Sequence, residues 1–301
     1  MVAPASPPLA GFACLVLAHD NPAQLLLLLR WLGENGATCH LHLDPRAAPV
    51  RAAVEATALP GVALLPVAES FRIEWGGYAM VRATLALLRA ALAQPGVQQV
   101  CLLSGTHLPL LPAEALARRL GDGRNHLDLR FACMEPPDRE SLHRFWFRGV
   151  PGRQETRPLV RWLNRHAWRL GPRDLARGLR GLTPMVGSQW WHLTAPAALE
   201  MLAFLDANPW YEAFFLHARI PDESFFQTLL GATPGIAALG PPMSFQCMRG
   251  YSPAVLEAAD LPAALASGAA FARKFDQRTQ PEAVRLALLA AQAEGALTRA
   301  G

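Results

Sequence analysis

Short apolar runs alternate with longer helical patterns through the first hundred residues of the chain. Four runs have the length and the β-branched or apolar content of strands, namely Phe12–Ala18, Thr38–Leu43, Val62–Pro66 and Gln99–Leu103. Helices are predicted between them: one through Trp31, one over Val50–Thr57 and a long one ending at Leu92. Strands that alternate with helices form parallel βαβ units. The pattern therefore predicts an α/β fold with an open, mostly parallel sheet flanked by helices.

The start of the first helix has a clear sequence signature. In Asn21-Pro22-Ala23-Gln24, the asparagine is a typical N-cap and the proline suits the first helical position. Gln24 stands where a side chain can return a hydrogen bond to the N-cap. We therefore predict a capping box at Asn21 and Gln24.

The alternation fades beyond Arg130 into a region rich in arginine and tryptophan, broken by Pro151-Gly152 and Gly171-Pro172. Regular patterns return afterwards as a β-like run at Met185–Leu193, a helix over Ala197–Leu205, an apolar segment at Pro221–Leu230 and an amphipathic helix from Pro281. We interpret residues 131–184 as an insertion within a single domain that spans 1–301.

Composition is that of a globular protein, because 51% of the 301 residues are hydrophobic. No apolar run approaches the roughly 20 residues that a membrane-spanning helix needs. Three prolines and no positive charge precede Phe12, which argues against a signal peptide. The five cysteines, Cys14, Cys39, Cys101, Cys133 and Cys247, contain no C-x-x-C pair and are expected to be free thiols. We expect a cytoplasmic protein.

The net charge is +4, but the basic residues are unusual: 27 are arginine and only one, Lys274, is lysine. Residues 139–180 hold eleven arginines and three acidic residues. This segment is either a solvated helix face or a surface for an anionic lipid, a membrane or an acidic acceptor. Nucleic acid is disfavoured as a partner, because no helix-turn-helix, zinc-finger or RNA-binding motif accompanies the arginines.

Polar residues directly follow the predicted strands. In an open α/β sheet, ligands bind at the carboxyl ends of the strands. This rule selects His19 and Asp20 after the first strand, Asp44 after the second, and Ser104, Thr106 and His107 after the fourth. We expect these side chains to converge on one cleft.

Several common active-site motifs are missing from the sequence. There is no G-x-G-x-x-G after the first strand, no G-x-x-x-x-G-K-[ST] and no G-x-S-x-G. Dinucleotide enzymes, P-loop enzymes and typical α/β-hydrolases are therefore disfavoured. No D-x-D pair occurs either, which is the motif that holds a divalent metal on the diphosphate in many nucleotide-sugar transferases.

Seven short blocks, in order, resemble one known family. They are Leu17-Ala18-His19 with Asn21-Pro22 and Gln24-Leu25, Leu41-His42-Leu43-Asp44, Trp75-Gly76-Gly77, Leu103-Ser104-Gly105 with Pro109, Gly187-Ser188-Gln189-Trp190-Trp191, Pro221-Asp222-Glu223-Ser224-Phe225-Phe226 with Thr228, and Phe271-Ala272-Arg273-Lys274-Phe275. From about residue 12 to 276, the chain resembles the core-2/I-branching N-acetylglucosaminyltransferases, including the peptide O-xylosyltransferase branch.

The resemblance implies a GT-A-like fold and a metal-independent, inverting glycosyltransferase. It implies a UDP-sugar donor and an acceptor hydroxyl on a glycan, a glycolipid or a protein. The last two blocks lean toward the xylosyltransferase branch, but for a cytoplasmic protein we expect N-acetylglucosamine to be the transferred sugar, with xylose next. By this resemblance, residues 12–130 form the nucleotide-sugar-binding half and residues 185–301 the acceptor and catalytic half.

Individual positions take their expected roles from the same resemblance. Around the uridine and the donor it places Ala18, His19, Asp44, Trp75 and Gly76, together with Ser104 in the donor half. It makes Glu223 the catalytic base, assigns Arg273 and Lys274 to the diphosphate, and places Gln189 and Trp190 at the acceptor and sugar contacts. One position departs from the family: His107 stands where relatives usually have an acidic residue, which leaves the donor-sugar contacts open.

Elementary chemistry supports two of these roles without the resemblance. Inverting transfer needs one base to take the proton of the acceptor hydroxyl, and a single carboxylate such as Glu223 suffices. We expect Asp222 to be an N-cap and Glu223 to begin a helix. Without a metal, fixed cations must stabilise the charge that develops on the departing diphosphate, and Arg273-Lys274 can supply them.

Two other functions remain open. His40, His42 and Asp44 alternate along one predicted strand and so share a face, which could hold a metal ion in a metal-dependent hydrolase. A catalytically inactive carbohydrate-binding relative is the third hypothesis, because His107 could mark a lost donor subsite.

Overall fold

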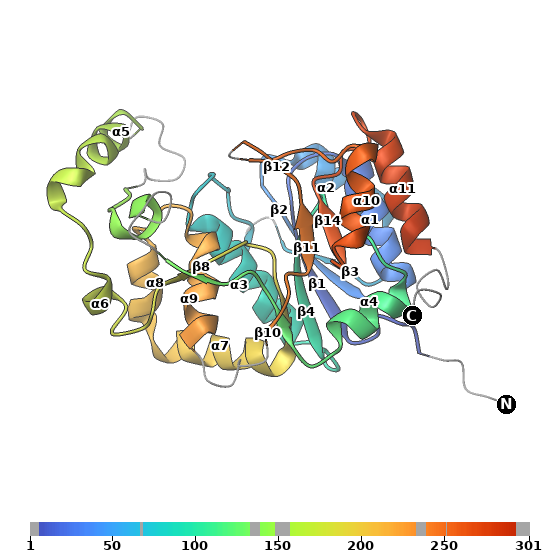
Figure 1. Cartoon of the computed structure of the whole chain (residues 1–301), viewed down its shortest axis with the longest axis horizontal. Coiled ribbons are helices and arrows are strands. Elements are labelled where there is room, and N and C mark those ends of the chain that lie inside the picture. The colour runs from blue at the N-terminus through green and yellow to red at the C-terminus, as the bar shows by residue number, and fades with distance from the viewer. Residues whose placement is uncertain are drawn as a thin grey trace.

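The computed structural model describes residues 6–66, 69–132, 139–147, 157–232, 239–250 and 252–292 (Figure 1). Its strands are β1 (Phe12–Ala18), β2 (Thr38–Leu43), β3 (Val62–Leu64), β4 (Gln99–Ser104), β5 (Leu108–Pro109), β6 (Asn125–His126), β7 (Arg130–Phe131), β8 (Met185–Val186), β9 (His192–Thr194), β10 (Leu239–Gly240), β11 (Ser244–Gln246), β12 (Met248–Arg249), β13 (Ser252–Pro253) and β14 (Phe271–Arg273). Its α-helices are α1 (Pro22–Glu34), α2 (Ala48–Thr57), α3 (Ala79–Leu92), α4 (Ala113–Leu120), α5 (Arg157–His166), α6 (Leu175–Gly178), α7 (Ala195–Ala207), α8 (Pro209–Phe215), α9 (Phe225–Ala232), α10 (Leu261–Ala266) and α11 (Pro281–Gln292).

A seven-stranded sheet in the order β10-β6-β9-β4-β1-β2-β3 forms the centre of the protein. Strands β4, β1, β2 and β3 are parallel, and only β9 runs antiparallel to its two neighbours, β4 and β6. In the central register, Cys14 of β1 lies between Cys39 of β2 and Cys101 of β4. The predicted α/β fold with a mostly parallel sheet is confirmed, and it agrees with a GT-A-like architecture.

Helices cover both faces of the parallel strands. The β1-α1-β2 and β2-α2-β3 crossovers move outward along the sheet, whereas β3-α3-β4 returns across β2 and β1. Because such crossovers are right-handed, α3 lies on the face opposite α1 and α2. Figure 1 shows the strands between α3 and the pair α1 and α2, and α3 contacts β1 and β2. Strands β1 and β4 are therefore buried on both faces, which explains their continuous apolar runs, whereas the edge strand β3 is only partly buried.

Helix α1 confirms the predicted start but not the capping box. Asn21 adopts a left-handed conformation, and its Oδ1 atom accepts a hydrogen bond from the Gln24 amide. The Gln24 side chain does not return to the N-cap, because its Oε1 atom accepts from the amide of Gln277. The backbone amide of Asn21 instead donates to Asp20 Oδ1. The Gln24 side chain thus binds a C-terminal loop and not the N-cap residue, so the predicted capping box does not form.

Two predictions for the second half of the chain need correction. The β-like run Met185–Leu193 is not one strand: β8 and β9 are separated because the Gly187 amide donates to the Glu223 carbonyl and the Ser188 amide to Asp128 Oδ2. The segment Pro221–Leu230 consists of a 3-10 turn, Pro221–Glu223, followed by α9. Asp222 lies inside that turn and is not an N-cap, and Glu223 does not begin α9.

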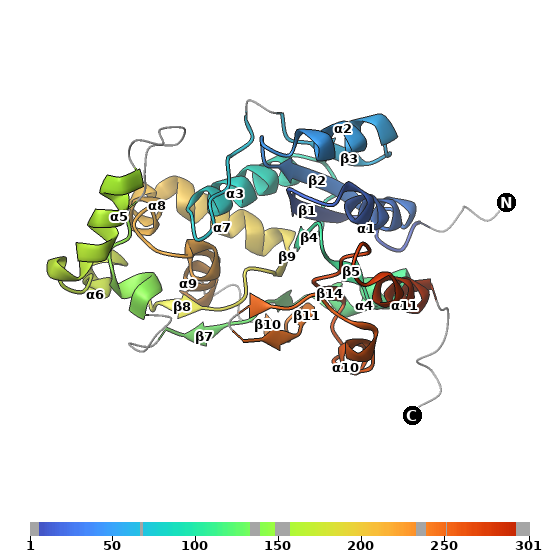
Figure 2. The ribbon, with the colours of Figure 1, turned by 90° about the horizontal axis from the view of Figure 1, so that it is seen from above.

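Smaller sheets complete the core around the C-terminal half. Strands β11, β14 and β5 form a three-stranded sheet, and β7 pairs with β8. The β7–β8 pair joins the two ends of the arginine-rich segment 131–184. Helices α5 and α6 of this segment lie at one end of the long axis, and α1, α4 and α11 lie at the other (Figures 1 and 2).

The described cysteines are free thiols: Cys14, Cys39 and Cys101 are buried, and Cys247 is partly buried. Cys133 lies outside the described residues. Within the described ranges, none of the helices combines the length and the apolar character that crossing a bilayer requires.

Candidate functional site

The carboxyl ends of β1 and β4 meet closely. A Cβ atom on Gly105 would stand 2.9 Å from the Cβ atom of Ala18, so only glycine permits this approach. The Gly105 amide donates to the carbonyl of Leu17. Ala18 and Ser104 therefore lie at the same edge of the sheet, with His19 exposed just beyond the end of β1.

Asp44 lies at the end of β2 and is buried. Its Oδ1 atom accepts from the amide and Nε of Arg46, and its Oδ2 atom accepts from Arg46 Nη2 at 2.6 Å and from the Ile73 amide at 2.9 Å. Burial favours the neutral carboxyl, but the bonds from Arg46 and Ile73 outweigh it and lower the pKa of Asp44 to about 2. Both oxygens of this carboxylate thus have protein partners.

His42 has a similar role on the same face of β2. Burial lowers the pKa of His42 to about 4, so the ring is neutral and its Nε2 atom accepts from the Phe71 amide at 2.9 Å. The ring stacks on Phe71. Together, His42 and Asp44 hold the backbone of residues 71–73 against the sheet.

The sequence left open a metal site on the face of β2 that carries His40 and His42, with Asp44 directly after the strand. His42 and Asp44 are bonded to backbone amides and to Arg46 instead. In the ranges that the structure describes, no three histidine, cysteine or acidic side chains are grouped as metal ligands. The observed bonds give these residues a structural role.

The loop held by His42 and Asp44 carries Trp75 and Gly76 toward the second half of the chain. Gly76 has a φ of 67°, which glycine adopts without strain, and its carbonyl accepts from the Ile220 amide at 3.1 Å. The exposed Trp75 ring lies 5.7 Å from the guanidinium of Arg219. Trp75 and Gly76 are therefore adjacent to the turn that contains Glu223.

Glu223 ends the 3-10 turn Pro221–Glu223. Ile220, at the N-cap of this turn, has a left-handed φ of 52°. The Glu223 carbonyl accepts from the Gly187 amide at 2.9 Å, which fixes the backbone against the segment between β8 and β9. The side chain reaches solvent, and none of the described residues hydrogen-bonds its carboxylate. The carboxylate is thus held in place by its backbone and left open.

The protein atoms crowded around Glu223 change its acidity. These atoms displace much of the water around the carboxyl group, and this desolvation raises the pKa of Glu223 to about 7. The nearby charges of Asp222 and Asp128 act in the same direction. The cationic side chains of Arg130 and Arg273 oppose the shift without cancelling it. A carboxylate with a pKa near neutrality can take up a proton and release it again.

Arg273 lies across the site at the end of β14. Its guanidinium carbon lies 4.7 Å from the centre of the Trp190 ring. Burial lowers the pKa of Arg273 to about 10, and the Glu223 charge opposes this shift. Its Nη1 atom lies 3.5 Å from Gln246 Oε1, its register partner on β11, whereas the buried Nε atom has no described partner. This guanidinium is a cation with unused donor capacity.

His107 packs against Trp190, the ring that Arg273 also contacts. The ring is fully buried, with its centre 5.0 Å from that of Trp190 in an edge contact. Its Nδ1 atom lies 2.9 Å from the Ser104 amide and hydroxyl, and its Nε2 atom lies 3.0 Å from Ser244 Oγ. Burial, with a contribution from Arg273, lowers the pKa of His107 well below its usual range. A neutral ring thus packs against Trp190 and supports it.

Gln189 and Gln227 add two further buried polar atoms to this region. Gln189 is buried, and its Nε2 atom has no partner among the described residues. Gln227 donates from Nε2 to the Ser188 carbonyl, but its Oε1 atom lacks a described partner. Buried polar atoms are almost always paired in native proteins, so these atoms are candidates for ligand contacts.

The C-terminal loop that follows Lys274 is bonded to the segment between β1 and α1. Asn21 Nδ2 donates to Asp276 Oδ1 at 2.9 Å, and Arg278 bridges Asp276 and Asp20. Lys274 is partly buried, and burial together with the neighbouring Arg273 lowers its pKa. These bonds bring the Arg273-Lys274 pair to the edge of the sheet that carries Ala18 and His19.

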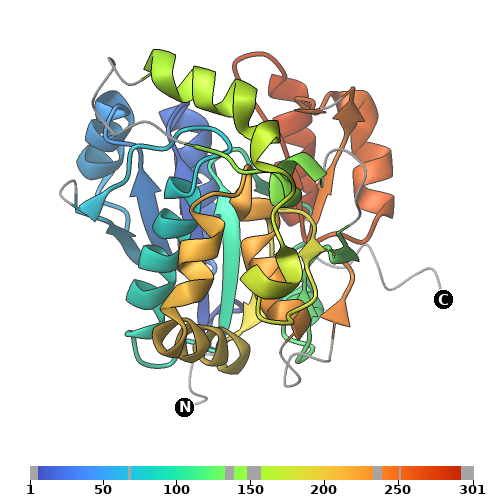
Figure 3. The ribbon, with the colours of Figure 1, turned by 90° about the vertical axis from the view of Figure 1, so that its left-hand side faces the viewer.

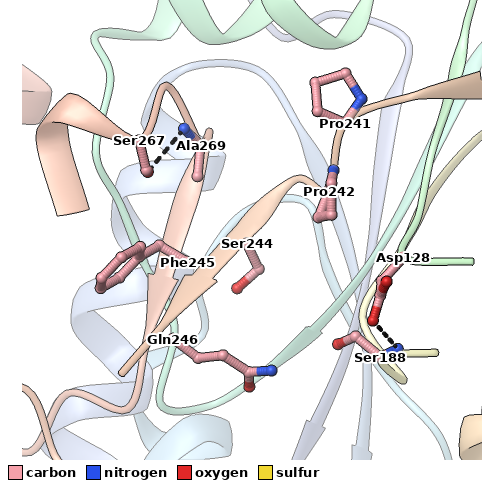
Figure 4. A pocket seen from close by; sticks show the side chains of 9 residues that line it. All are labelled: Asp128, Ser188, Pro241, Pro242, Ser244, Phe245, Gln246, Ser267 and Ala269. Carbon is pink, nitrogen blue, oxygen red and sulfur yellow. Dashed lines mark hydrogen bonds between the residues drawn. The ribbon is translucent and has the colours of Figure 1, made fainter. Parts of the chain in front are cut away.

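A pocket of about 310 Å³ opens beside strand β11. Figure 4 shows Ser244 and Gln246 of β11 on one side and Asp128, hydrogen-bonded to Ser188, on the other. Its lining residues are Asp128, Ser188, Pro241, Pro242, Ser244, Phe245, Gln246, Ser267 and Ala269. Gln246 connects the pocket to Arg273, and Ser188 connects it to the segment that bonds the Glu223 backbone.

The structure therefore brings together Glu223, Arg273 and Trp190, and it joins Trp75 and Gly76 to the Glu223 turn. Sequence analysis missed Asp128, Ser244 and Gln246, which line the pocket. These residues lie in or near strands of two or three residues, which are too short to produce a recognisable pattern. The roles of Ala18, His19, Trp75, Gly76 and Ser104 in donor binding stay predictions.

Comparison with known proteins identifies the family. The family model described as Core-2/I-Branching enzyme matches residues 12–239, a range that includes His19, Trp75 and Glu223. The match ends before Arg273 and Lys274, so their assignment depends on the local residues and the geometry. No curated protein sequence matches the chain. From its fold and this match, the chain belongs to the core-2/I-branching enzyme family of glycosyltransferases.

Proposed function

We propose that this glycosyltransferase moves a sugar from a UDP-sugar to an acceptor hydroxyl with inversion and without a metal ion. The observation that carries the proposal is Glu223, whose carboxylate has no hydrogen-bond donor among the described residues and a pKa of about 7. As a base, Glu223 takes the acceptor proton while the hydroxyl oxygen attacks the anomeric carbon from the face opposite UDP.

Arg273 and Lys274 stabilise the leaving group in this proposal. When the bond to the sugar breaks, negative charge develops on the diphosphate, and fixed cations at that position lower the barrier. Arg273 has an unpartnered Nε atom and stacks on Trp190. A guanidinium can bind two phosphate oxygens at once, whereas the lysine ammonium acts as a compact point charge.

The donor side of the proposal uses Ala18, His19, Asp44, Trp75, Gly76 and Ser104. Asp44 acts through its partners, because its two oxygens already hold Arg46 and the Ile73 amide. Ser104 likewise bonds to Thr106 and His107. Support for these positions comes from the family match and from their common location at the sheet edge.

The sugar and the acceptor meet at the pocket in this proposal. Serine hydroxyls, the Gln246 amide and the Asp128 carboxylate suit the hydroxyl groups of a sugar. Gln189 and Trp190 lie beside it and contact the acceptor or the transferred sugar. N-acetylglucosamine is the first choice and xylose the second, and the acceptor is a glycan, a glycolipid or a protein.

A panel of UDP-sugars tests the function directly. Purified protein is incubated with UDP-N-acetylglucosamine, UDP-xylose and UDP-glucose, and released UDP is measured with and without EDTA. We expect one donor to be hydrolysed or transferred at a rate that the chelator leaves unchanged, and a product with inverted anomeric configuration by NMR. Activity that EDTA abolishes and manganese restores would refute metal independence.

The same assay separates the remaining alternative. An inactive carbohydrate-binding relative would bind UDP-sugars by calorimetry but would release no UDP from any of them. A retained anomeric configuration would contradict the role of Glu223 as a single base.

A further inference from the structure

The arginine-rich segment takes no part in the proposed chemistry, yet it has a distinctive surface. Residues 157–180 contain seven arginines and a single acidic residue, Asp174. We infer that the solvent-facing side of α5 and of the 3-10 helix that follows it, Ala167–Leu170, docks on an anionic lipid bilayer. This inference is independent of the transfer reaction, because it concerns residues that the proposed chemistry does not use.

Large apolar side chains point into solvent on this surface. Leu159 and Trp162 of α5 are 58% and 54% exposed, and Trp168 and Leu170 of the 3-10 helix are 64% and 59% exposed. Soluble proteins expose single apolar residues often, but four large ones within twelve residues form an unusual cluster. Water is an unfavourable environment for this much apolar surface.

Arginines flank the apolar side chains. Leu159 and Trp162 are three residues apart and therefore neighbours on the helix surface, and Arg161 and Arg165 form a second row beside them. Both arginines are exposed, as is Arg169 in the next turn. None of these three has an ion pair with a described residue. Their charge is therefore available to a partner.

The combination favours a bilayer over other polyanions. A helix that lies in a membrane interface presents tryptophan and leucine to the acyl chains and arginine to the anionic headgroups. A polysaccharide or nucleic acid would use the arginines but would leave Leu159 and Leu170 in water. The exposed indoles of Trp162 and Trp168 are amphipathic, which suits the headgroup region.

Side-chain contacts attach this surface firmly to the body of the protein. Asn164 on the inner side of α5 donates to the Phe147 carbonyl and accepts from the Phe147 amide at 2.7 Å. Arg144 Nη2 donates to the Asn164 carbonyl. Buried Arg173 stacks on Phe214 at 3.8 Å. Figure 3 looks onto this end of the molecule, where α5 crosses the upper edge. The apolar side chains are thus presented on a fixed helix.

Vesicle flotation tests the inference without donor or acceptor, so its result does not depend on the proposed function. The purified full chain is mixed with vesicles of phosphatidylcholine alone or with phosphatidylglycerol added. We expect binding to the anionic vesicles only, weakened by salt, because exposed charges are screened.

Variants identify the surface. Arg161→Ala with Arg165→Ala should lower vesicle affinity by roughly 25-fold, from about fivefold for each basic residue near an anionic surface. The matched control is Arg30→Ala with Arg118→Ala, which removes the same charge from exposed positions on α1 and α4 at the other end of the molecule. An equal loss in the control would show diffuse attraction and overturn the inference.

Tryptophan variants test the apolar part separately. Trp162→Ser with Trp168→Ser should weaken binding at constant charge, and quenching of tryptophan fluorescence by brominated lipid should disappear. Circular dichroism checks that each variant is folded. Unchanged binding and quenching in this double variant, or binding to an acidic polysaccharide without binding to vesicles, would refute bilayer docking.

Discussion

The polar side chains around the candidate site form two sets that differ in their partners. The strand-end set, His42, Asp44, Ser104 and His107, comes from the parallel half of the sheet, and each member is hydrogen-bonded within the protein. The late set comes from the second half of the chain: Gln189 from the segment between β8 and β9, Glu223 from a 3-10 turn and Arg273 from the end of β14. Each of its members has a polar atom without a hydrogen-bond partner among the described residues.

The difference indicates a division between support and chemistry. Gln189 and Arg273 each have a buried polar atom without a described partner, which costs about 1 to 3 kcal/mol unless a ligand satisfies it, whereas the Glu223 carboxylate is exposed and open to a ligand. The strand-end set has no such capacity left. We therefore expect substitutions in the late set to impair turnover or binding, and substitutions in the strand-end set to impair stability.

The largest effect is expected at Glu223. Glu223→Gln should lower turnover by at least about 100-fold, because the amide cannot accept the acceptor proton. Its melting temperature and UDP affinity should match the wild type. Glu282→Gln, which changes an exposed carboxylate on α11, is the control and should retain activity. Turnover within threefold of wild type in Glu223→Gln would remove this residue from the catalytic role.

Asp44 tests the strand-end set through stability. The folded-state pKa of about 2 lies below the unfolded value near 3.9, so the ionised carboxylate stabilises the fold above pH 4 by about 2 to 3 kcal/mol. This contribution is lost as the pH falls toward 2. Asp44→Asn should remove most of it, as measured by urea unfolding at neutral pH. If Asp44→Asn kept the stability of the wild type but lost UDP binding, Asp44 would contact the ligand and would not belong to the strand-end set.

Arg273 and Lys274 test the diphosphate assignment. Arg273→Ala and Lys274→Ala should each weaken UDP binding about 10- to 100-fold, the range for a lost hydrogen bond to a charged group. Affinity for uridine, which has no phosphate, should change much less in calorimetry. Arg285→Ala, which removes an exposed arginine paired with Glu282, is the charge-matched control. Equal UDP affinity in all variants would show that the diphosphate binds elsewhere.

The smallest effect is a pH dependence. Because Glu223 must be ionised to act as a base, kcat/KM should fall about tenfold per pH unit below its pKa of about 7. Arg273 lowers that pKa, so Arg273→Ala should move the ascending limb to higher pH. An identical profile in the variant would contradict electrostatic coupling between the two residues.

Prediction from sequence was most accurate for the buried parallel strands. β1 and β2 have the predicted bounds: β1 is covered on both faces and apolar throughout its length, and β2 is buried from Cys39 to Leu43. The errors occur at Gln24, at Met185–Leu193 and at Asp222-Glu223. At each of these places, a bond to a residue distant in sequence, such as Gly187 to Glu223, replaces the local structure that the pattern predicts.

The sequence alone determined the α/β fold, the family and the short list that contains Glu223, Arg273 and Lys274, because periodicity and motifs are local properties. The tertiary structure decided which polar atoms remain available. It paired Asp44 with Arg46 and Ile73, buried His107 beneath Trp190, and placed Arg273 beside Glu223 with its Nε atom free of described partners. Hydrogen-bond saturation and desolvation depend on neighbours brought together by folding, and no local pattern specifies those neighbours.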